Sequence, residues 1–225
     1  MTTKRSNLTK IDQAPVTLRD MVQERMREAI IEGHFSPGER LVERPLCDQL
    51  GVSRTVIRET IRYLEAEGLV EIIPNKGPIA AQMNWRDAKQ IYEIRKQLET
   101  SAAVACAQSH SKAMKQKLKS ALDTLRHAYK EDQATLFRAT TEFYQIIFEE
   151  AEHHIALEIV QRLNGRISRL RVMTLSTQDR FKSGFAHMKA ISEAILLNDP
   201  IAAEKAIEAH ITDASQIAER LLSDN

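Results

Sequence analysis

One short connection between two helical patterns restricts the fold of this chain more than any other feature. A helix with Pro45 in its first turn is predicted to stop at Gly51. A second helix begins directly after Ser53, so only Val52 and Ser53 separate the two. This tight spacing is typical of a helix–turn–helix.

The second helix of this pair, residues 54–65, has two distinct faces. Its apolar side chains recur at the spacing of one helical stripe: Ile57, Ile61 and Leu64. Its arginines step by four along a neighbouring stripe: Arg54, Arg58 and Arg62. Ser53 is expected to cap the first turn, and Gly68 to end the helix. A helix that packs by one face and presents arginines beside it fits the major groove of DNA, where arginine binds guanine or a phosphate.

Taken alone, this arginine stripe is better explained as a solvated basic face, but the flanking segments favour DNA binding. Residues 18–30 repeat apolar side chains every four positions and predict a preceding helix. Residues 69–73 and 78–81 predict two strands joined by a turn. Three helices followed by a hairpin describe a winged helix–turn–helix over residues 16–82. Two residues at the hairpin tip are expected to approach the minor groove or the DNA backbone: Lys76 and Gly77.

Several runs of residues also carry a family resemblance: GHFSPGERL at 33–41, LGVSRT at 50–55, RE at 58–59 and LEAEGLV at 64–70. Together they resemble the GntR family of bacterial transcription regulators. The family often has proline where this chain has Val56, a first-turn position at which valine costs little. The resemblance implies that four residues meet the operator: Arg44, Arg54, Arg58 and Gly77. Ser53 and Thr55 lie beside them, where their hydroxyls can bind phosphates.

The net charge of the chain is only +1, so DNA binding must come from a local basic patch. A length of 225 residues allows two modest domains, and an aromatic content of 5% with few glycines and prolines favours helices.

Cys47 and Cys106 are far apart in the sequence and are expected to be free thiols in a reducing cytosol. No apolar run has membrane-spanning length, so we expect a cytoplasmic protein without a membrane partner. Residues 1–15 are polar and predict a flexible tail.

Residues 83–225 predict an all-α domain, because strand patterns stop after the hairpin. Helical patterns recur in six segments: 85–105, 112–129, 132–148, 155–174, 181–197 and 200–222. Asn84 is expected to cap the first of them, and the fourth is expected to carry its basic residues on the outer face. The predicted fold is therefore mainly α, with a winged helix–turn–helix and a small β-hairpin before a bundle of about six helices.

Two parts of this second region carry a further resemblance: YEIRKQLE at 92–99, and matching positions from His187 to Ile211. They are similar to the FCD domain of the FadR-like subgroup of the GntR family. The resemblance implies a site for an effector, usually a small organic acid or a similar metabolite, and a role in dimerisation. Many members of the subgroup also hold a divalent metal through an Asp and a His on a middle helix and two later histidines.

This chain departs from that metal pattern. The Asp and His positions of the middle helix are occupied by Thr140 and Tyr144, while His187 and His210 remain. Two imidazoles without a carboxylate are a weak ligand set, because zinc usually takes three or four protein ligands. We therefore expect no cofactor, and a bound zinc or similar divalent ion is disfavoured.

In place of the metal, four polar side chains are predicted to line an effector pocket: Thr140, Tyr144, His187 and His210. Arg95 is expected to bind a carboxylate of the effector in bidentate fashion. The alternative is that all five residues only pack within the helical core, with Arg95 paired to Glu99 or Glu93 on its own helix.

These features predict a homodimeric repressor that binds a pseudo-palindromic, double-stranded operator under the control of a small carboxylate effector. One alternative is a regulator whose C-terminal domain no longer senses a ligand and only dimerises. A second alternative is a metal-dependent helical enzyme. Against the enzyme, the sequence contains no Gly-x-Ser-x-Gly, no His-Glu-x-x-His and no phosphate-binding loop.

Overall fold

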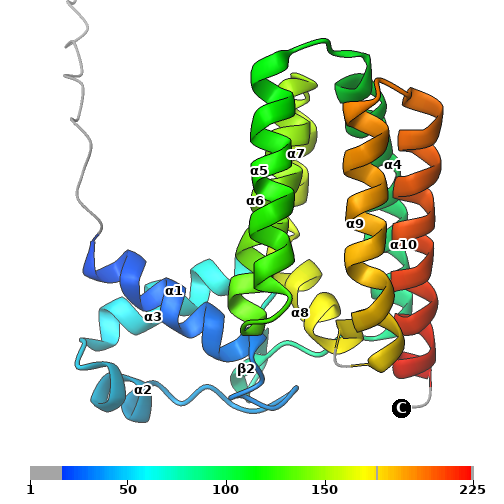
Figure 1. The fold of residues 1–225 in the computed structure, drawn as a ribbon. Helices are drawn as coiled ribbons and strands as arrows, with labels where there is room; N and C mark the ends of the chain where they lie inside the picture. Colours follow the sequence, from blue (N-terminus) through cyan, green and yellow to red (C-terminus); the bar gives the residue numbers. More distant parts are fainter. Residues whose placement is uncertain (1–16, 176, 224–225) are drawn as a thin grey trace, which may run out of the picture.

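The computed structural model describes residues 17–175 and 177–223, with only the backbone at 133–134 and 178–182. These residues form ten helices and one antiparallel β-hairpin. The N-terminal helices and the hairpin make a small unit beside an upright bundle of the later helices (Figure 1). The predicted mainly α fold, with a hairpin between the two groups of helices, is confirmed. The flexible tail predicted for residues 1–15 lies outside the described residues.

Three helices build the N-terminal unit: α1 (Leu18–Ile31), α2 (Glu43–Leu50) and α3 (Arg54–Ala66). Thr17 caps α1 with a capping box, and the Ser53 hydroxyl accepts the Val56 N–H at 3.5 Å at the start of α3. Gly51 ends α2 at a φ of +66°, a conformation that glycine adopts without a Cβ penalty. The predicted starts and stops of this helix–turn–helix are therefore confirmed.

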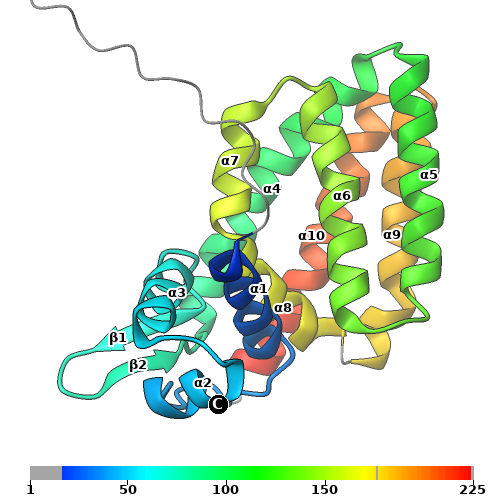
Figure 2. The same ribbon diagram turned by 90° about the vertical axis from the view of Figure 1, so that its left-hand side faces the viewer.

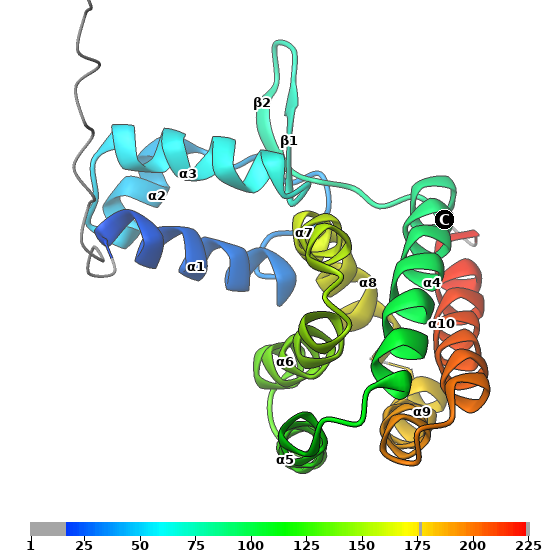
Figure 3. The ribbon, with the colours of Figure 1, turned by 90° about the horizontal axis from the view of Figure 1, so that it is seen from above.

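The hairpin consists of β1 (Val70–Ile73) and β2 (Gly77–Ala80), so β1 begins one residue later than predicted and β2 begins and ends one residue earlier. Its turn is closed by a hydrogen bond from the Lys76 N–H to the Ile73 carbonyl at 3.1 Å, with Asn75 at a φ of +63°. Seen from above, the hairpin projects away from α1 and α3, which lie side by side (Figure 3).

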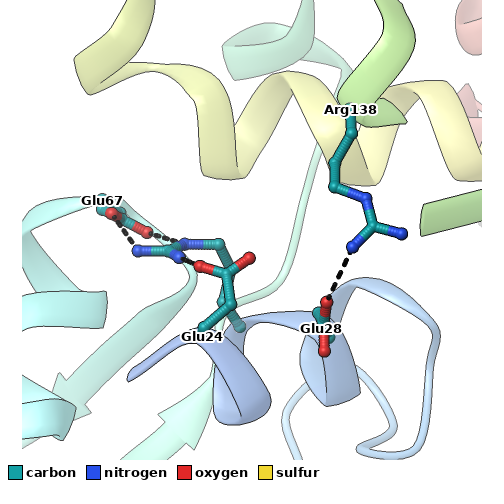
Figure 4. A network of polar contacts seen from close by, with 5 residues as sticks. Glu24, Glu28, Glu67 and Arg138 are labelled. Carbon is teal, nitrogen blue, oxygen red and sulfur yellow. Dashed lines mark hydrogen bonds and ion pairs between the residues drawn. The ribbon is translucent and has the colours of Figure 1, made fainter. Parts of the chain in front are cut away.

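A compact apolar core holds the N-terminal unit together. Its buried members come from the three helices, from β1 and from the segments that precede α2 and β1: Val22, Met26, Ile30, Ile31, Leu41, Leu46, Ile57, Ile61, Leu64, Leu69 and Val70. An ion pair between α1 and the end of α3 adds to this apolar core. Arg27 of α1 donates to both carboxylate oxygens of Glu67 at 2.9 and 2.8 Å and also pairs with Glu24 (Figure 4). This bidentate contact ties α1 to the C-terminal end of α3.

Seven helices of the described residues form the second unit: α4 (Trp85–Gln108), α5 (Lys112–Ala128), α6 (Gln133–Glu150), α7 (His154–Arg162), α8 (Asn164–Leu175), α9 (Gln178–Leu196) and α10 (Pro200–Ser223). Asn84 caps α4 by accepting the Asp87 N–H at 2.9 Å, and Asp132 caps α6 in the same way. Among the described residues, no helix is long and apolar enough to cross a lipid bilayer.

The single helix predicted for residues 155–174 is in fact two helices. The chain bends at Leu163, between α7 and α8. Past the bend, Gly165 lies so close to the N-terminal unit that a Cβ there would be 2.7 Å from Leu69 Cγ and 2.9 Å from the Glu67 carbonyl oxygen. Packing against the first unit thus sets the direction of α8, which lies between α1 and α10 (Figure 2).

Candidate DNA interface and effector pocket

The residues predicted to contact DNA are exposed, apart from Gly77, which is half-buried: Arg44, Ser53, Arg54, Thr55, Arg58 and Lys76. They lie on α2, on α3 with its cap, and at the hairpin tip, on the side of the molecule away from the bundle (Figure 2). Gly77 has a φ of +84° and lies beside Arg40, whose Nε would be 3.9 Å from a Cβ at that position. The arrangement offers several cations and hydroxyls to a backbone of phosphates.

Arg58 is held by a residue that the sequence did not single out. Its Nε donates to Glu43 Oε1 of α2 at 2.8 Å, and this hydrogen bond lowers the pKa of the Glu43 carboxyl. The pair is solvent-exposed and contributes little to stability. It nevertheless fixes the direction of the Arg58 side chain across the two helices, and no local pattern reveals a contact between residues so far apart in sequence.

A small cavity with charged, polar and apolar lining residues lies inside the bundle. Its lining includes three of the five residues predicted for the effector pocket: Arg95, Thr140 and His210. Other lining residues come from α4, α5, α8, α9 and α10: Tyr92, Tyr129, Arg171, Thr174, Leu175, Met188 and Ala214. The cavity holds only about 20 Å³ of free space, which is room for about one water molecule. A metabolite can enter only if the lining helices move apart.

Arg95 is already paired. Its Nε and Nη2 donate to the two carboxylate oxygens of Glu99, one helical turn along α4, at 2.7 and 3.3 Å. Burial works to lower the pKa of Arg95, but the Glu99 carboxylate outweighs it and holds that pKa above its usual value. The predicted role of Arg95 as a carboxylate clamp would require an effector to displace Glu99.

Thr140 and Tyr144 occupy the positions at which the resemblance placed metal ligands. The Thr140 hydroxyl donates to the Leu136 carbonyl at 2.7 Å on its own helix. The Tyr144 ring is buried 6.4 Å from the His210 ring, between centroids. Its hydroxyl has no hydrogen-bond partner of ordinary geometry within the described ranges. Burial, and then the nearby Glu99 carboxylate, raise the pKa of Tyr144 well above its usual value.

The two histidines lie close together, with ring centroids 5.7 Å apart. His187 Nε2 lies 3.3 Å from Asp213 Oδ2, and the same oxygen accepts a hydrogen bond from the Ser183 hydroxyl at 2.8 Å. Asp213 follows His210 by one helical turn and was missed by the sequence reasoning. In the part of the chain that the structure describes, no three His, Cys, Asp or Glu side chains are placed to hold a metal ion.

Arg171 is a pocket residue that the sequence placed on the outer face of its helix, and that interpretation is wrong. Its guanidinium carbon lies 5.7 Å from the Phe137 ring centroid and 6.0 Å from that of Tyr144. Its Nη1 atom is buried without a hydrogen-bond partner among the described residues, although the side chain as a whole keeps some exposure. Burial, and then the charge of Arg95, lower the pKa of Arg171 to about 10. The helical pattern failed here because α8 has neighbours on both sides.

Helix α8 contacts the N-terminal unit with one face and the cavity with the other. Three residues on one stripe meet the N-terminal unit: Gly165, Arg169 and Val172. Arg169 donates from Nη1 to the Ala81 carbonyl, and Val172 packs against the N-terminal core. Arg171 and Thr174 line the cavity. Arg169 and Arg171 are two positions apart, or about 200° around the helix, so they point in nearly opposite directions.

A second contact joins the two units on the same side. Arg138 of α6 lies 3.9 Å from Glu28 of α1, between Nη1 and Oε1 (Figure 4). Arg138 is exposed and Glu28 is partly exposed, so this pair adds little energy. The principal connection between the units is therefore the buried packing of α8.

Comparisons with known proteins match both units. The profile of bacterial regulatory proteins of the gntR family matches residues 18–78, and that of the FCD domain matches residues 90–213. The HTH-type transcriptional regulator YdhC of Bacillus subtilis is 23% identical over 88% of this chain and 90% of its own length. The HTH-type transcriptional repressor RspR of Escherichia coli is 22% identical over 89% of this chain and 88% of its own. Among solved structures, E. coli McbR/YncC shares the fold with a TM-score of 0.76 and 19% identity, over 92% of this chain and 99% of that one.

Proposed function

The chain belongs to the GntR family of bacterial regulatory proteins and carries an FCD domain, and from this premise we propose that it is a repressor controlled by a small organic acid. Its family and relatives are DNA-binding transcription regulators and not enzymes. A regulator of this kind acts on the bacterial chromosome, so its place is the cytoplasm. Repression is supported by one relative that is named as a transcriptional repressor, RspR of E. coli.

Operator binding is assigned to the exposed cations of α2, α3 and the hairpin. Arg54 and Arg58 on α3 are the candidates for base contacts in the major groove, and Lys76 for the DNA backbone. Ser53 and Thr55 offer hydroxyls to phosphates at the start of the same helix. A homodimer would place two such helices on two half-sites of a pseudo-palindromic operator.

The observation that carries effector control is the position of α8. The same helix lines the cavity through Arg171 and Thr174 and packs on the DNA-binding unit through Arg169 and Val172. A ligand that enters the cavity must move the helices that line it. A shift of α8 would change the position of the N-terminal unit that packs against this helix. Such a ligand alters operator affinity by as much as its own affinity differs between the two arrangements.

The alternative of a C-terminal domain that only dimerises also has an observation in its favour. About 20 Å³ of free space does not accommodate an organic acid without rearrangement. The melting temperature distinguishes a ligand-sensing regulator from one whose C-terminal domain only dimerises. A ligand that binds only the folded state must raise the melting temperature. A panel of organic acids that leaves the melting temperature unchanged would favour the non-sensing regulator.

The test of the whole proposal is a fluorescence-anisotropy titration of the full-length protein on a fragment of its own upstream region, with and without each organic acid. We expect specific binding by a dimer, and weaker binding in the presence of one acid. Native mass spectrometry of the protein–DNA complex gives the number of subunits per fragment. Binding as a monomer, or equal affinity for an unrelated fragment, would contradict the operator assignment.

A further inference from the structure

We propose that Arg171 is the residue that receives the acid group of the effector, and that the pocket therefore selects small, singly charged carboxylates. This inference rests on the proposed function, because it names the receiving residue and the ligand class of the same pocket. Arg171 lines the cavity from α8. Its buried Nη1 atom finds no hydrogen-bond acceptor in the described part of the protein.

Among the residues whose side chains the structure describes, the ionisable groups around Arg171 leave a positive charge uncompensated. Of the described groups, those that act on it most strongly are Arg95, Glu99, Tyr144 and Tyr129. The carboxylate of this set, Glu99, is already occupied by two hydrogen bonds from Arg95. Two guanidiniums thus share one carboxylate. Because a buried charge is costly unless it is paired and hydrogen-bonded, an anion from solution would relieve the cost at Arg171.

The aromatic neighbours of Arg171 orient it but do not neutralise it. Its guanidinium carbon lies within 6.0 Å of the ring centroids of both Phe137 and Tyr144. Ring faces attract a cation through a quadrupole and carry no net charge. The N–H groups in the guanidinium plane stay available for a carboxylate, which accepts two parallel hydrogen bonds from arginine.

The cavity also limits the rest of the ligand. A single uncompensated cation matches one carboxylate better than two. The remaining wall includes Tyr92, Tyr129 and His210, and it mixes hydroxyls with apolar side chains: Thr140, Thr174, Leu175, Met188 and Ala214. Since the free space is only about 20 Å³, every added carbon requires the helices to separate further. A monocarboxylate with a short carbon body, with or without a hydroxyl group, fits these constraints.

The experiment is thermal melting of the full-length wild type and of the variants Arg171→Met, Arg171→Lys and Arg169→Met. The probes are sodium acetate, propionate, lactate and succinate at fixed ionic strength, with acetamide, propionamide and lactamide as uncharged counterparts. Wild type should melt about 5–10 °C higher when a monocarboxylate is present at about a hundredfold its Kd. The amides should have no effect. Arg171→Met should lose the shift, and Arg171→Lys should keep part of it.

Melting in acid-free buffer gives a second readout that a purely structural arginine would not produce. Arg171→Met removes an unpaired charge and keeps an apolar side chain beside the rings, so it should melt about 2–4 °C above wild type. Arg169→Met is the matched control, because Arg169 lies on the opposite face of the same helix. That variant removes the contact with Ala81 and no group that lines the cavity, so the acid should still raise its melting temperature.

The possible failures are distinguishable. If wild type responds to an acid and Arg171→Met responds equally, the role of Arg171 is overturned while effector control stands. A lower melting temperature of Arg171→Met in acid-free buffer would also overturn it, since the charge would then be compensated already. A response to succinate without any response to the monocarboxylates would reject the ligand class. If no acid shifts wild type, the organic-acid part of the proposed function fails together with this inference.

Discussion

Arg95 and Glu99 form a buried, bidentate ion pair within the centre of the C-terminal bundle, one helical turn apart on α4. The two hydrogen bonds measure 2.7 and 3.3 Å, and each residue is only 1% exposed. The pair neutralises one guanidinium and, in the described part of the chain, leaves Arg171 without a carboxylate of its own. The charge of the cavity lining therefore depends on Glu99.

Glu99→Gln should destabilise the fold strongly, because it leaves Arg95 and Arg171 as two unpaired buried cations. Breaking a buried pair in this way costs about 3–5 kcal/mol, which urea denaturation can measure. Glu193→Gln is the matched control: Glu193 pairs with Lys189 at the same spacing on α9, but at the surface, at 3.4 Å. It should cost less than about 1 kcal/mol. Equal losses for the two variants would show that the buried pair has no special role.

Arg58→Ala should weaken operator binding by about 1–3 kcal/mol, because it removes a proposed contact to base edges or phosphates. Anisotropy titration on the upstream fragment measures the loss. Glu43→Gln keeps Arg58 but removes the carboxylate that its Nε contacts at 2.8 Å. Because the pair lies at the surface, this variant should change the free energy of operator binding by less than about 1 kcal/mol. An unchanged affinity of Arg58→Ala would remove this residue from the interface.

Lys76→Ala should weaken binding by a similar factor on operator and non-operator DNA, because the exposed hairpin tip is assigned to the backbone. Removing one phosphate contact should also reduce the slope of log K against log salt by about 1. Titrations at several salt concentrations give that slope. A loss confined to the operator would instead show that Lys76 reads sequence.

Gly165→Ala should disturb the contact between α8 and the DNA-binding unit. The added Cβ would lie 2.7 Å from Leu69 Cγ and 2.9 Å from the Glu67 carbonyl oxygen, so the helix must shift. We expect a loss of about 1–3 kcal/mol in stability. We also expect a smaller effect of the acid on operator affinity, with unchanged acid binding by calorimetry. Lys189→Ala changes an exposed site on α9. It should leave the stability and the effect of the acid on operator affinity as in wild type.

Cys106 should be inert to thiol reagents in the folded protein. Burial, and then the Glu150 carboxylate, raise the pKa of its thiol to about 12, so the reactive thiolate is scarce at neutral pH and grows only as pH approaches that value. Cys47 is partly exposed. Ellman's reagent should therefore titrate one thiol in the native state and a second after denaturation. Rapid reaction of both thiols at neutral pH would contradict the buried position of Cys106.

Local rules were sufficient for the elements of the fold. The caps at Ser53 and Asn84 and the stop at Gly51 lie where the sequence predicted them. Each depends on contacts within about one helical turn, so the residues that decide it are neighbours in the chain. The same holds for the exposed arginines of α3, whose stripe follows from helical periodicity alone.

The composition of the pocket was decided by tertiary packing. Sequence placed Arg171 on an outer face and joined α7 to α8, because a helical pattern assumes one buried side and one solvated side. The N-terminal unit covers α8 from outside, so Arg171 faces the cavity instead of solvent. The partners Glu43 for Arg58 and Asp213 for His187 come from distant segments. The sequence by itself determined the elements and their order, whereas the pairing of charges between them depends on how the helices pack, which no local pattern encodes.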